Sequence, residues 1–240
     1  MNKLLNIVVA TGLGNEVGNY FFSSLRSALV VQFSSARLVA RFVDVNDILP
    51  VLRDSKRVAE IMLHALLSPR YPVPNLVLIP CNSVHIASPY LKSAFYDSFV
   101  PIDEAVMSLI GREGRKGRFL ILGTSTTLES GMYQEGLRRL DCELLTLPPK
   151  AQAELDDFIF NDLVNGKMDT SYLNILRELE HRYMELLKAD HVILACTELC
   201  YLVQVFSQPL ACEVDSLQAL HDAGIERLQA HMKNEPVYAY

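Results

Sequence analysis

Two cysteines of this chain stand in matching sequence surroundings. Cys81 follows the apolar run Leu76–Pro80 and Cys196 follows Val192–Ala195, and each precedes small polar residues and a helical pattern. A thiol has an ordinary pKa of about 8.5, and the partial positive charge of a helix N-terminus favours the thiolate. Two such thiols on opposite sides of one carbon could serve as base and acid and exchange roles when the reaction reverses. The pair therefore suggests inversion of a stereocentre by proton transfer.

Hydroxyl and amide side chains lie close to both cysteines in the sequence. Such donors at helix starts commonly hold carboxylates. The candidates are Asn82, Ser83, Thr124, Thr126, Thr127 and Thr197. Gly123 would let the main chain approach a ligand closely. His85, one helical turn beyond Cys81, is a candidate proton relay, and an ordinary local hydrogen bond explains it equally well.

Other interpretations of the cysteines stay open. Buried core positions are common for cysteine, and each of the two could be core or helix-start filler. Cys196 and Cys200 could face one another on a helix with His191 near in sequence. A zinc site needs more ligands at better spacing, so we predict no metal.

Short apolar runs alternate with helical patterns along the whole chain. Strands are expected at Leu4–Ala10, Leu38–Val43, Leu76–Pro80, Ser98–Ile102, Phe119–Gly123, Glu143–Leu147, Val192–Ala195 and Leu210–Val214. Helices are expected at about 18–32, 51–68, 85–95, 103–111, 127–140, 151–165, 171–188, 198–206 and 216–232. Apolar runs without polar alternation are typical of strands covered on both faces. The order predicts an α/β protein with parallel sheets.

An internal similarity links the two halves. The segment Ile7–Gly12 resembles Phe119–Thr124, and Val77–Ser83 resembles Val192–Glu198 at nearly the same offset. Both members of the second pair end in a cysteine followed by small polar residues. This pattern favours a duplication, which would give two related halves.

Composition indicates a folded protein without an extended charged surface. Of the 240 residues, half are hydrophobic and 21% are charged, with a net charge of −6. The sequence contains no block of like charges, so we predict neither a nucleic-acid partner nor binding to a membrane surface. The five cysteines are irregularly spaced, which favours a reduced, cytoplasmic setting over a disulfide framework. The run Leu4–Ala10 is too short for a signal peptide, and no membrane span is expected.

The cysteine segments resemble a known family. Pro80–His85 (PCNSVH) and Ala195–Glu198 (ACTE) are similar to the paired signatures of the aspartate/glutamate racemase superfamily. The glutamate after the second Cys-Thr resembles the aspartate racemase branch. Leu122–Thr127 resembles that family's Gly-Thr-x-x-Thr loop, and Asn165–Lys167 resembles an element whose lysine approaches the substrate's distal carboxylate. Glu213–Ser216 resembles its last strand and the start of its final helix.

The resemblance implies two pseudo-symmetric parallel-sheet α/β domains with the active site in the cleft between them. The first domain would comprise residues 1–102 plus 209–240, and the second residues 103–208. Cys81 and Cys196 would be the catalytic thiols of a racemase that needs neither pyridoxal phosphate nor any other cofactor. His85 and Glu198 would tune or relay protons for the nearer cysteine, and Lys167 would bind an acidic substrate.

The first loop departs from the family pattern. Thr11 and Gly12 stand in the expected substrate-binding loop, but Val17 and Gly18 replace expected hydroxyl residues, and Phe42 replaces a serine. These changes remove polar donors and add apolar bulk, so they put the identity of the substrate side chain in question.

Three functions remain in competition at this level. The first is an amino-acid racemase interconverting L- and D-aspartate, or glutamate, and working as a homodimer. The second is a superfamily member with other chemistry, maleate isomerase-like or hydantoin racemase-like, in which one cysteine can be a nucleophile. The third is a catalytically silent ligand-binding protein.

Overall fold

Each half of the chain builds its own parallel sheet. The computed structural model describes residues 5–14, 16–32, 36–67, 73–208 and 213–233. The chain divides into two compact units, the first of Met1–Ile102 with Leu220–Tyr240 and the second of Asp103–Ala219. Three strands form one sheet and four form the other, and every strand pair is parallel. The predicted α/β class with parallel sheets is confirmed.

The sheet of the first unit has the order β2-β1-β3. It consists of β1 (Leu5–Thr11), β2 (Ala36–Phe42) and β3 (Leu76–Leu78). The side chains of β3 are fully buried, as expected for a short apolar strand with no polar alternation. Both β1 and β3 lead into segments that carry candidate site residues.

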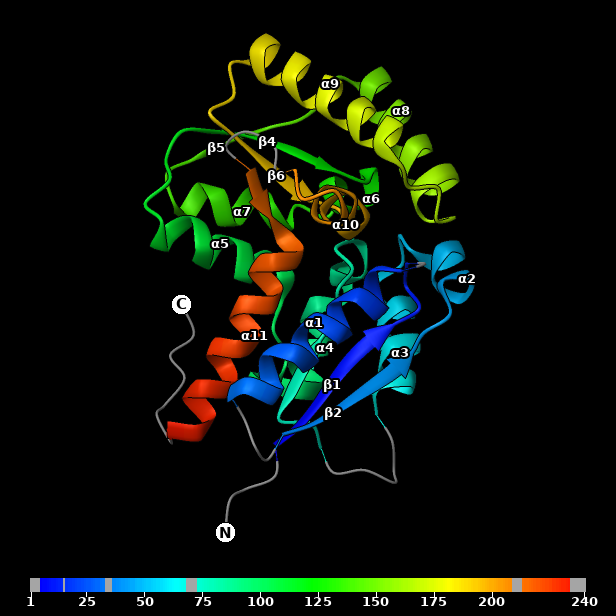
Figure 1. Ribbon diagram of the computed structural model, residues 1–240, viewed down its shortest axis with the longest axis vertical. Helices are drawn as coiled ribbons and strands as arrows, with labels where there is room; N and C mark the ends of the chain where they lie inside the picture. Colours follow the sequence, from blue (N-terminus) through cyan, green and yellow to red (C-terminus); the bar gives the residue numbers. More distant parts are fainter. Residues whose placement is uncertain (1–4, 15, 33–35, 68–72, 209–212, 234–240) are drawn as a thin grey trace. The chain divides into compact units, whose positions relative to one another are not determined.

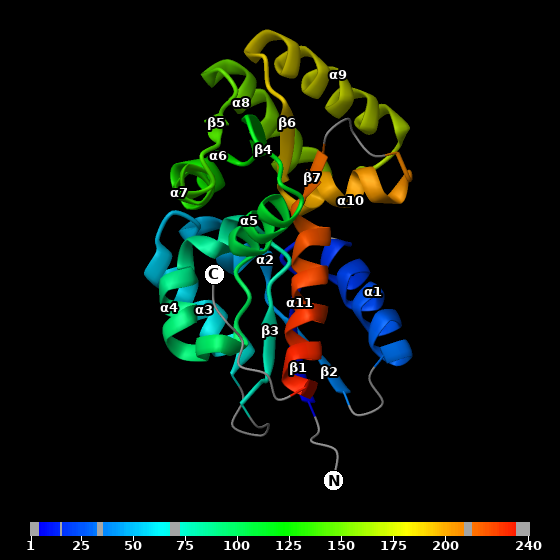
Figure 2. The same ribbon diagram turned by 90° about the vertical axis from the view of Figure 1, so that its left-hand side faces the viewer.

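Helices cover the first sheet. They are α1 (Val17–Gln32), α2 (Val45–Ile48), η1 (Leu49–Val51), α3 (Ser55–Leu66), η2 (Ser83–Ala87), α4 (Ser88–Phe95) and η3 (Tyr96–Ser98). Figure 2 shows the sheet between α1 on one side and α3 with α4 on the other. The final helix α11 (Ser216–Lys233) continues into this unit, and its Gly224 packs so closely on Leu78 that a Cβ there would lie 2.9 Å from Cδ1.

The sheet of the second unit has the order β5-β4-β6-β7. Its strands are β4 (Arg118–Gly123), β5 (Glu143–Leu145), β6 (His191–Ala195) and β7 (Glu213–Asp215). The expectation that the last strand joins the first domain is wrong, because β7 pairs with β6 from Val192↔Glu213 to Leu194↔Asp215. The first residues of that expected strand, 210–212, lie outside the described residues.

Helices of the second unit alternate with its strands, and the first of them precedes β4. They are α5 (Ile102–Arg112), α6 (Ser125–Glu129), α7 (Met132–Arg139), α8 (Pro149–Asp157), the π-helical turn η4 (Phe158–Leu163), α9 (Thr170–Leu187) and α10 (Thr197–Val205). The single helix expected at 127–140 is two helices, because Gly131 adopts a positive φ of 71° between them. Figure 1 shows α8 and α9 running alongside one another, and α9 contacts both β4 and β6.

One expected strand does not form. The run Ser98–Ile102 makes only an isolated bridge, Val77↔Phe99, and a hydrogen bond from the Val100 amide to the Val77 carbonyl at 3.2 Å. Pro101 cannot donate a main-chain hydrogen bond, and α5 begins at Ile102, so pairing cannot extend further. The run is apolar because it is buried beside β3, without being a full strand.

The two sheets share one connectivity. In each, the first strand of the unit lies between the second and the third, since β1 lies between β2 and β3 and β4 lies between β5 and β6. The internally similar sequence segments fall on equivalent strands, β1 with β4 and β3 with β6. Cys81 and Cys196 therefore follow equivalent strands of two units with the same strand order, as a duplication predicts.

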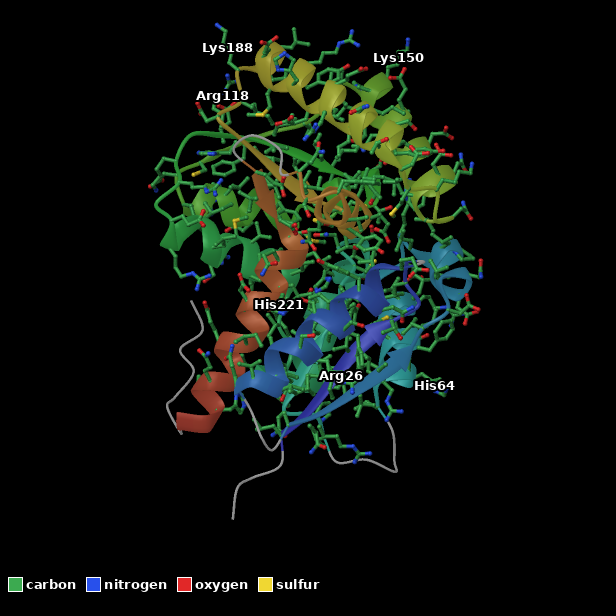
Figure 3. All side chains as sticks on the ribbon, viewed as in Figure 1. Arg26, His64, Arg118, Lys150, Lys188 and His221 are labelled. Carbon is green, nitrogen blue, oxygen red and sulfur yellow. The ribbon has the colours of Figure 1, made fainter. Side chains whose placement is uncertain are left out.

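Hydrogen bonds at the amino ends of β4 and β6 tie the two strands together. The Arg118 guanidinium donates to the Lys188 carbonyl at 3.1 Å, and the Arg118 amide donates to the Asp190 carboxylate at 2.8 Å. Figure 3 labels Arg118 and Lys188 near one another at this end. These contacts hold the end of the sheet opposite to Gly123 and Ala195.

At the carboxyl ends, β4 and β6 approach so closely that only glycine fits at position 123. A Cβ on Gly123 would lie 2.6 Å from the Ala195 carbonyl oxygen, a main-chain atom that cannot move alone. Gly123→Ala should therefore lower the free energy of unfolding by about 1–3 kcal/mol, as overpacking does. Urea unfolding followed by circular dichroism measures the change.

Gly111→Ala is the matched control. Gly111 lies in α5, and its added Cβ would meet only Leu140 Cδ2 at an ordinary 3.7 Å. Since alanine is the better helix former, this variant should be as stable as the parent or more so. Equal stability of the two variants would contradict the close approach of β4 and β6.

Candidate active site

The second unit brings Cys196 next to the turn after β4. Gly123 and Ala195 are the last paired residues of β4 and β6, so Thr124 and Cys196 leave the sheet side by side. Cys196 is the extended N-cap residue of α10, with φ −145° and ψ 123°. Carboxyl ends of parallel strands are the usual ligand-binding edge of an open α/β sheet. The strand register, rather than sequence proximity, therefore joins these two segments.

Cys196 and Glu198 form a buried hydrogen-bonded pair. The Cys196 Sγ donates to Glu198 Oε2 at 3.2 Å, and the Thr197 hydroxyl donates to the same oxygen, also at 3.2 Å. All three side chains are buried, with Thr197 fully so. The sequence predicts that Thr197 binds the substrate directly, but its hydroxyl here donates a hydrogen bond to the Glu198 carboxylate. The arrangement gives the Cys196 proton an acceptor within the protein.

The pKa of Cys196 departs from the sequence expectation. Burial, followed by the neighbouring Glu198 carboxylate, raises the pKa of the Cys196 thiol well above its ordinary value. Main-chain hydrogen bonds from Glu198 and Leu199 at the helix start act in the opposite direction but are outweighed. The expectation of a lowered pKa is wrong for Cys196, because loss of water disfavours the thiolate more than the helix end favours it. Burial also raises the pKa of Glu198.

The threonine turn after β4 is a closed hydrogen-bonded unit. Thr124 is the N-cap of α6, and its Oγ1 accepts from the Thr127 amide at 3.3 Å and lies 3.2 Å from Thr127 Oγ1. Both threonines are buried, whereas Thr126 is half-buried. The turn thus places three predicted carboxylate-binding residues at the sheet edge that carries Cys196.

Two residues of α8 contact this turn, and sequence reasoning missed both. Asp156 accepts a hydrogen bond from the Ser125 amide at 2.9 Å and another from the Ser125 hydroxyl. Gln152 Nε2 donates to the Gly123 carbonyl at 2.8 Å and to Asp156 Oδ1 at 3.0 Å. Only the tertiary fold reveals these contacts, since the residues lie about thirty positions from the turn in sequence and carry no motif of their own.

The first unit presents Cys81 at the corresponding place. Cys81 is half-buried just beyond β3, and its amide donates to the Ile79 carbonyl at 2.8 Å. Asn82 and Ser83, the predicted carboxylate donors, are buried directly after it. The following element is the 3-10 helix η2 and not the α-helix that the pattern suggested. Cys81 therefore precedes only a short helical turn, and the partial positive charge at its start is that of a few aligned peptide groups.

His85 binds the main chain of Cys81. Its Nδ1 lies 2.8 Å from the Cys81 carbonyl oxygen, and its ring stacks on Phe99 with centroids 5.5 Å apart. Burial, the largest cause, lowers the pKa of His85 to about 4, so the ring is neutral near pH 7. A neutral ring bonded to a carbonyl fits the local structural role better than proton relay.

The loop after β1 is shaped by tight packing. Gly12 has a φ of 87°, and a Cβ there would lie 2.5 Å from both Phe42 Cε2 and the Val43 carbonyl. A Cβ on Gly18 would lie 3.0 Å from Thr11 Cα, so α1 packs directly on the end of β1. Glycine at position 18 therefore has a packing reason. Phe42, where a serine was expected, ends β2 with 72% of its surface exposed.

Lys167 lies in an exposed turn of the second unit. Its Nζ forms an ion pair with Asp162 Oδ1 at 2.9 Å, and that contact raises the pKa of the lysine. A substrate carboxylate would have to replace or join Asp162 to bind there.

The predicted site residues fall into one set in each unit. Thr11, Gly12, Cys81, Asn82, Ser83 and His85 belong to the first unit. Thr124, Thr126, Thr127, Lys167, Cys196, Thr197 and Glu198 belong to the second. In the parts of the chain that the structure describes, no group of three His, Cys, Asp or Glu side chains is placed to hold a metal ion. Over the same residues, no helix has the length and apolar character needed to cross a bilayer.

Comparison with known proteins identifies the family. Residues 26–223 match the Asp/Glu/Hydantoin racemase family. The chain belongs to this family. The superfamily resemblance seen in the cysteine segments is thereby confirmed. No curated protein matches this racemase-family chain.

Several solved structures share the fold of this chain. An aspartate racemase homologue from Pyrococcus horikoshii OT3 is 20% identical, with a TM-score of 0.71 over 93% of this chain and 98% of that one. A putative Asp/Glu racemase from Yersinia pestis is 20% identical, with a TM-score of 0.75 over 94% and 100%. Glutamate racemase isoform RacE1 from Bacillus anthracis is 16% identical, with a TM-score of 0.62 over 96% and 84%. At these identities the likeness establishes a shared fold.

The Cys196–Glu198 pair makes a prediction about thiol titration. Glu198→Gln removes the negative charge that raises the pKa of Cys196, so this pKa should fall while staying above its ordinary value because the thiol remains buried. The pH dependence of iodoacetamide labelling, followed by mass spectrometry of the Cys196 peptide, measures the shift. Glu178→Gln, an exposed change on α9, should leave the profile unchanged. Identical profiles for both variants would contradict the coupling.

Burial of neutral His85 makes stability depend on pH. Unfolding restores an ordinary pKa near 6.5 from about 4, so the unfolded chain binds the extra proton between these values and stability falls as the pH drops. The loss from this residue between pH 7 and pH 5 should be about 2 kcal/mol. Urea unfolding of His85→Asn at both pH values should show a smaller loss than the parent. His64→Asn, an exposed change on α3 that Figure 3 locates, should keep the parental loss.

Proposed function

We propose that this protein is a cofactor-independent amino-acid racemase that interconverts L- and D-aspartate, or glutamate, through Cys81 and Cys196. One observation carries the proposal: the two cysteines follow equivalent strands, β3 and β6, of two units with the same strand order. Each also follows a strand that neighbours the unit's first strand. Family membership supports racemisation as the reaction class.

The proposed reaction moves one proton on each face of the α-carbon. A thiolate removes the α-proton and becomes a thiol, and the other thiol protonates the carbanion from the opposite face and becomes a thiolate. Proton-transfer contacts of roughly 3–3.5 Å on each side would put the sulfurs about 7–8 Å apart in the working enzyme. The raised pKa of Cys196 fits it as the initial proton donor, with Cys81 as the initial base.

Glu198 would then reset Cys196 between reaction directions. Its Oε2 already accepts from Sγ at 3.2 Å, and its own pKa is raised by burial, so a proton can be shared between the two groups. A forward turnover leaves Cys196 as the thiolate, which is the base for the reverse reaction, and a proton returned to Sγ through Glu198 restores the thiol for the next forward turnover. His85 has no part in this transfer and serves to hold the Cys81 main chain.

Substrate binding would rest on the hydroxyl and amide groups at the two sheet edges. Asn82 and Ser83 in the first unit, and Thr124 and Thr127 in the second, are buried donors beside the cysteines. They would stabilise the dianion that develops when a carboxylate's α-carbon loses its proton. Lys167 would bind the distal carboxylate of an acidic substrate, exchanging its contact with Asp162.

A second candidate is racemisation of a hydantoin, which the family description also includes. The exposed Phe42 ring over Gly12 favours an uncharged, partly apolar substrate at this loop. Such a substrate would not use Lys167. The cytoplasmic homodimer expected from the sequence remains part of either proposal.

Proton exchange in deuterium oxide tests the function directly. The protein should replace the α-proton of L-aspartate or L-glutamate by deuterium and build up the D-enantiomer, as followed by NMR and chiral chromatography. Cys81→Ala and Cys196→Ala should each lower the racemisation rate by about 10²–10⁴-fold in both directions, since each removes a general acid–base. Exchange on a 5-substituted hydantoin alone would favour the second candidate.

Cys142→Ala is the matched control. Cys142 directly precedes β5 and so lies at the amino end of its strand, whereas Cys196 lies at the carboxyl end of β6. The Cys142 Sγ contacts the Leu140 carbonyl at 3.4 Å. The variant should racemise at the parental rate. Absence of exchange with every amino acid and hydantoin would exclude the racemase proposal.

A further inference from the structure

The contacts between α8 and the threonine turn have no part in the chemistry proposed above, and they involve two polar side chains. Asp156 accepts hydrogen bonds from both the amide and the hydroxyl of Ser125. Gln152 donates to the Gly123 carbonyl at 2.8 Å, on the other side of Thr124 in the chain. The main-chain groups before and after Thr124 are thus both bound by one helix.

From this geometry we infer that Asp156 and Gln152 are positioning residues that hold the Thr124–Thr127 turn in its ligand-binding form. The inference rests on the proposed function, in which this turn binds the substrate carboxylate. Asp156 cannot bind that carboxylate itself, because two negative groups at close range repel one another. It acts through the turn.

The hydrogen bonds that Asp156 accepts explain why its carboxylate can lie beside a turn that is proposed to bind the substrate carboxylate. Its oxygens accept from the Ser125 amide, the Ser125 hydroxyl and Gln152 Nε2, the last at 3.0 Å. Charge-assisted hydrogen bonds of this kind are stronger than neutral ones and are sensitive to geometry. The Ser125 hydroxyl is directed to α8 by the same contact, whereas the hydroxyls of Thr124 and Thr127 lie 3.2 Å from one another within the turn.

The close approach at Gly123 makes the position of the turn sensitive to these contacts. The turn starts where β4 lies against Ala195, so a Cβ would come within 2.6 Å of that carbonyl. The strand end cannot move toward β6, and Gln152 binds the Gly123 carbonyl from α8. Loss of the α8 contacts would free the turn to shift, and misplacement of a binding group by about 1 Å can cost about 100-fold in rate.

The test compares two adjacent aspartates of α8. Asp156→Ala should lower kcat/KM for α-proton exchange by about 100-fold. Asp157→Ala removes an exposed carboxylate that accepts a hydrogen bond from Asn161, and it should leave kcat/KM within about twofold, as ordinary surface changes do. Asp156→Asn keeps an acceptor for the Ser125 amide and should recover most of the lost kcat/KM. It can be measured in place of the alanine variant if that variant does not fold.

Two further measurements separate positioning from general stability. The Ser125 amide should exchange with solvent at least about 10-fold faster in Asp156→Ala than in Asp157→Ala, since its hydrogen bond is lost. Adding Asp156→Ala to Thr124→Val should lower kcat/KM no further than Thr124→Val alone, because residues that act through one another are not additive. Fully additive losses would overturn the inference.

The outcomes distinguish the inference from the proposed function. Faster Ser125 exchange with unchanged kcat/KM in Asp156→Ala would overturn the positioning role while leaving the racemase intact. Unchanged Ser125 exchange would overturn the contact on which the inference depends. A parent protein that exchanges no α-proton would exclude the proposed function, and with it the catalytic meaning of the turn, whatever the amide exchange shows.

Discussion

The approach of two main chains at the carboxyl ends of β4 and β6 determines where the candidate site residues of the second unit lie. Gly123 and Ala195 are register partners, and a single added methyl group at position 123 would come within 2.6 Å of the Ala195 carbonyl oxygen. Because the strands meet this closely, the segments that leave them start side by side. Thr124 opens the threonine turn, and Cys196 opens α10 with Glu198 in its first turn. The chemistry of both segments therefore depends on one steric condition in the sheet.

Desolvation decides the resting state of Cys196. Helix starts favour anions, and the main-chain hydrogen bonds from Glu198 and Leu199 do lower the pKa of this thiol. Burial and a neighbouring carboxylate act the other way and are larger. The same burial keeps His85 neutral in the first unit, where the ring binds a carbonyl instead of carrying a proton. For Cys196 and for His85, burial outweighs the other contributions and favours the neutral form.

The repeated strand order gives each cysteine an equivalent place, while the surroundings differ. Cys196 has a buried carboxylate as a hydrogen-bond partner, and Cys81 is half-buried next to a 3-10 turn whose histidine holds its carbonyl. The second sheet also carries an additional strand, β7, at its edge. Two units with the same arrangement of three strands but unlike cysteine environments suit the proposed reaction, in which the two thiols start in different protonation states.

The amino-acid sequence by itself determined the fold class, most of the strands and the two cysteine segments, because apolar runs of buried strands and short polar motifs are local features. It also indicated the family, since Pro80–His85 and Ala195–Glu198 carry their signatures within a few residues. Tertiary structure alone decided the pairing of β7 with β6, the raised pKa of Cys196 and the contacts of Asp156 with Ser125. Each of these depends on which distant main-chain and side-chain groups meet and how much water they exclude. The spacing of neighbouring residues specifies neither which distant groups meet nor how much water they exclude, so both are decided only when the sheets and helices pack.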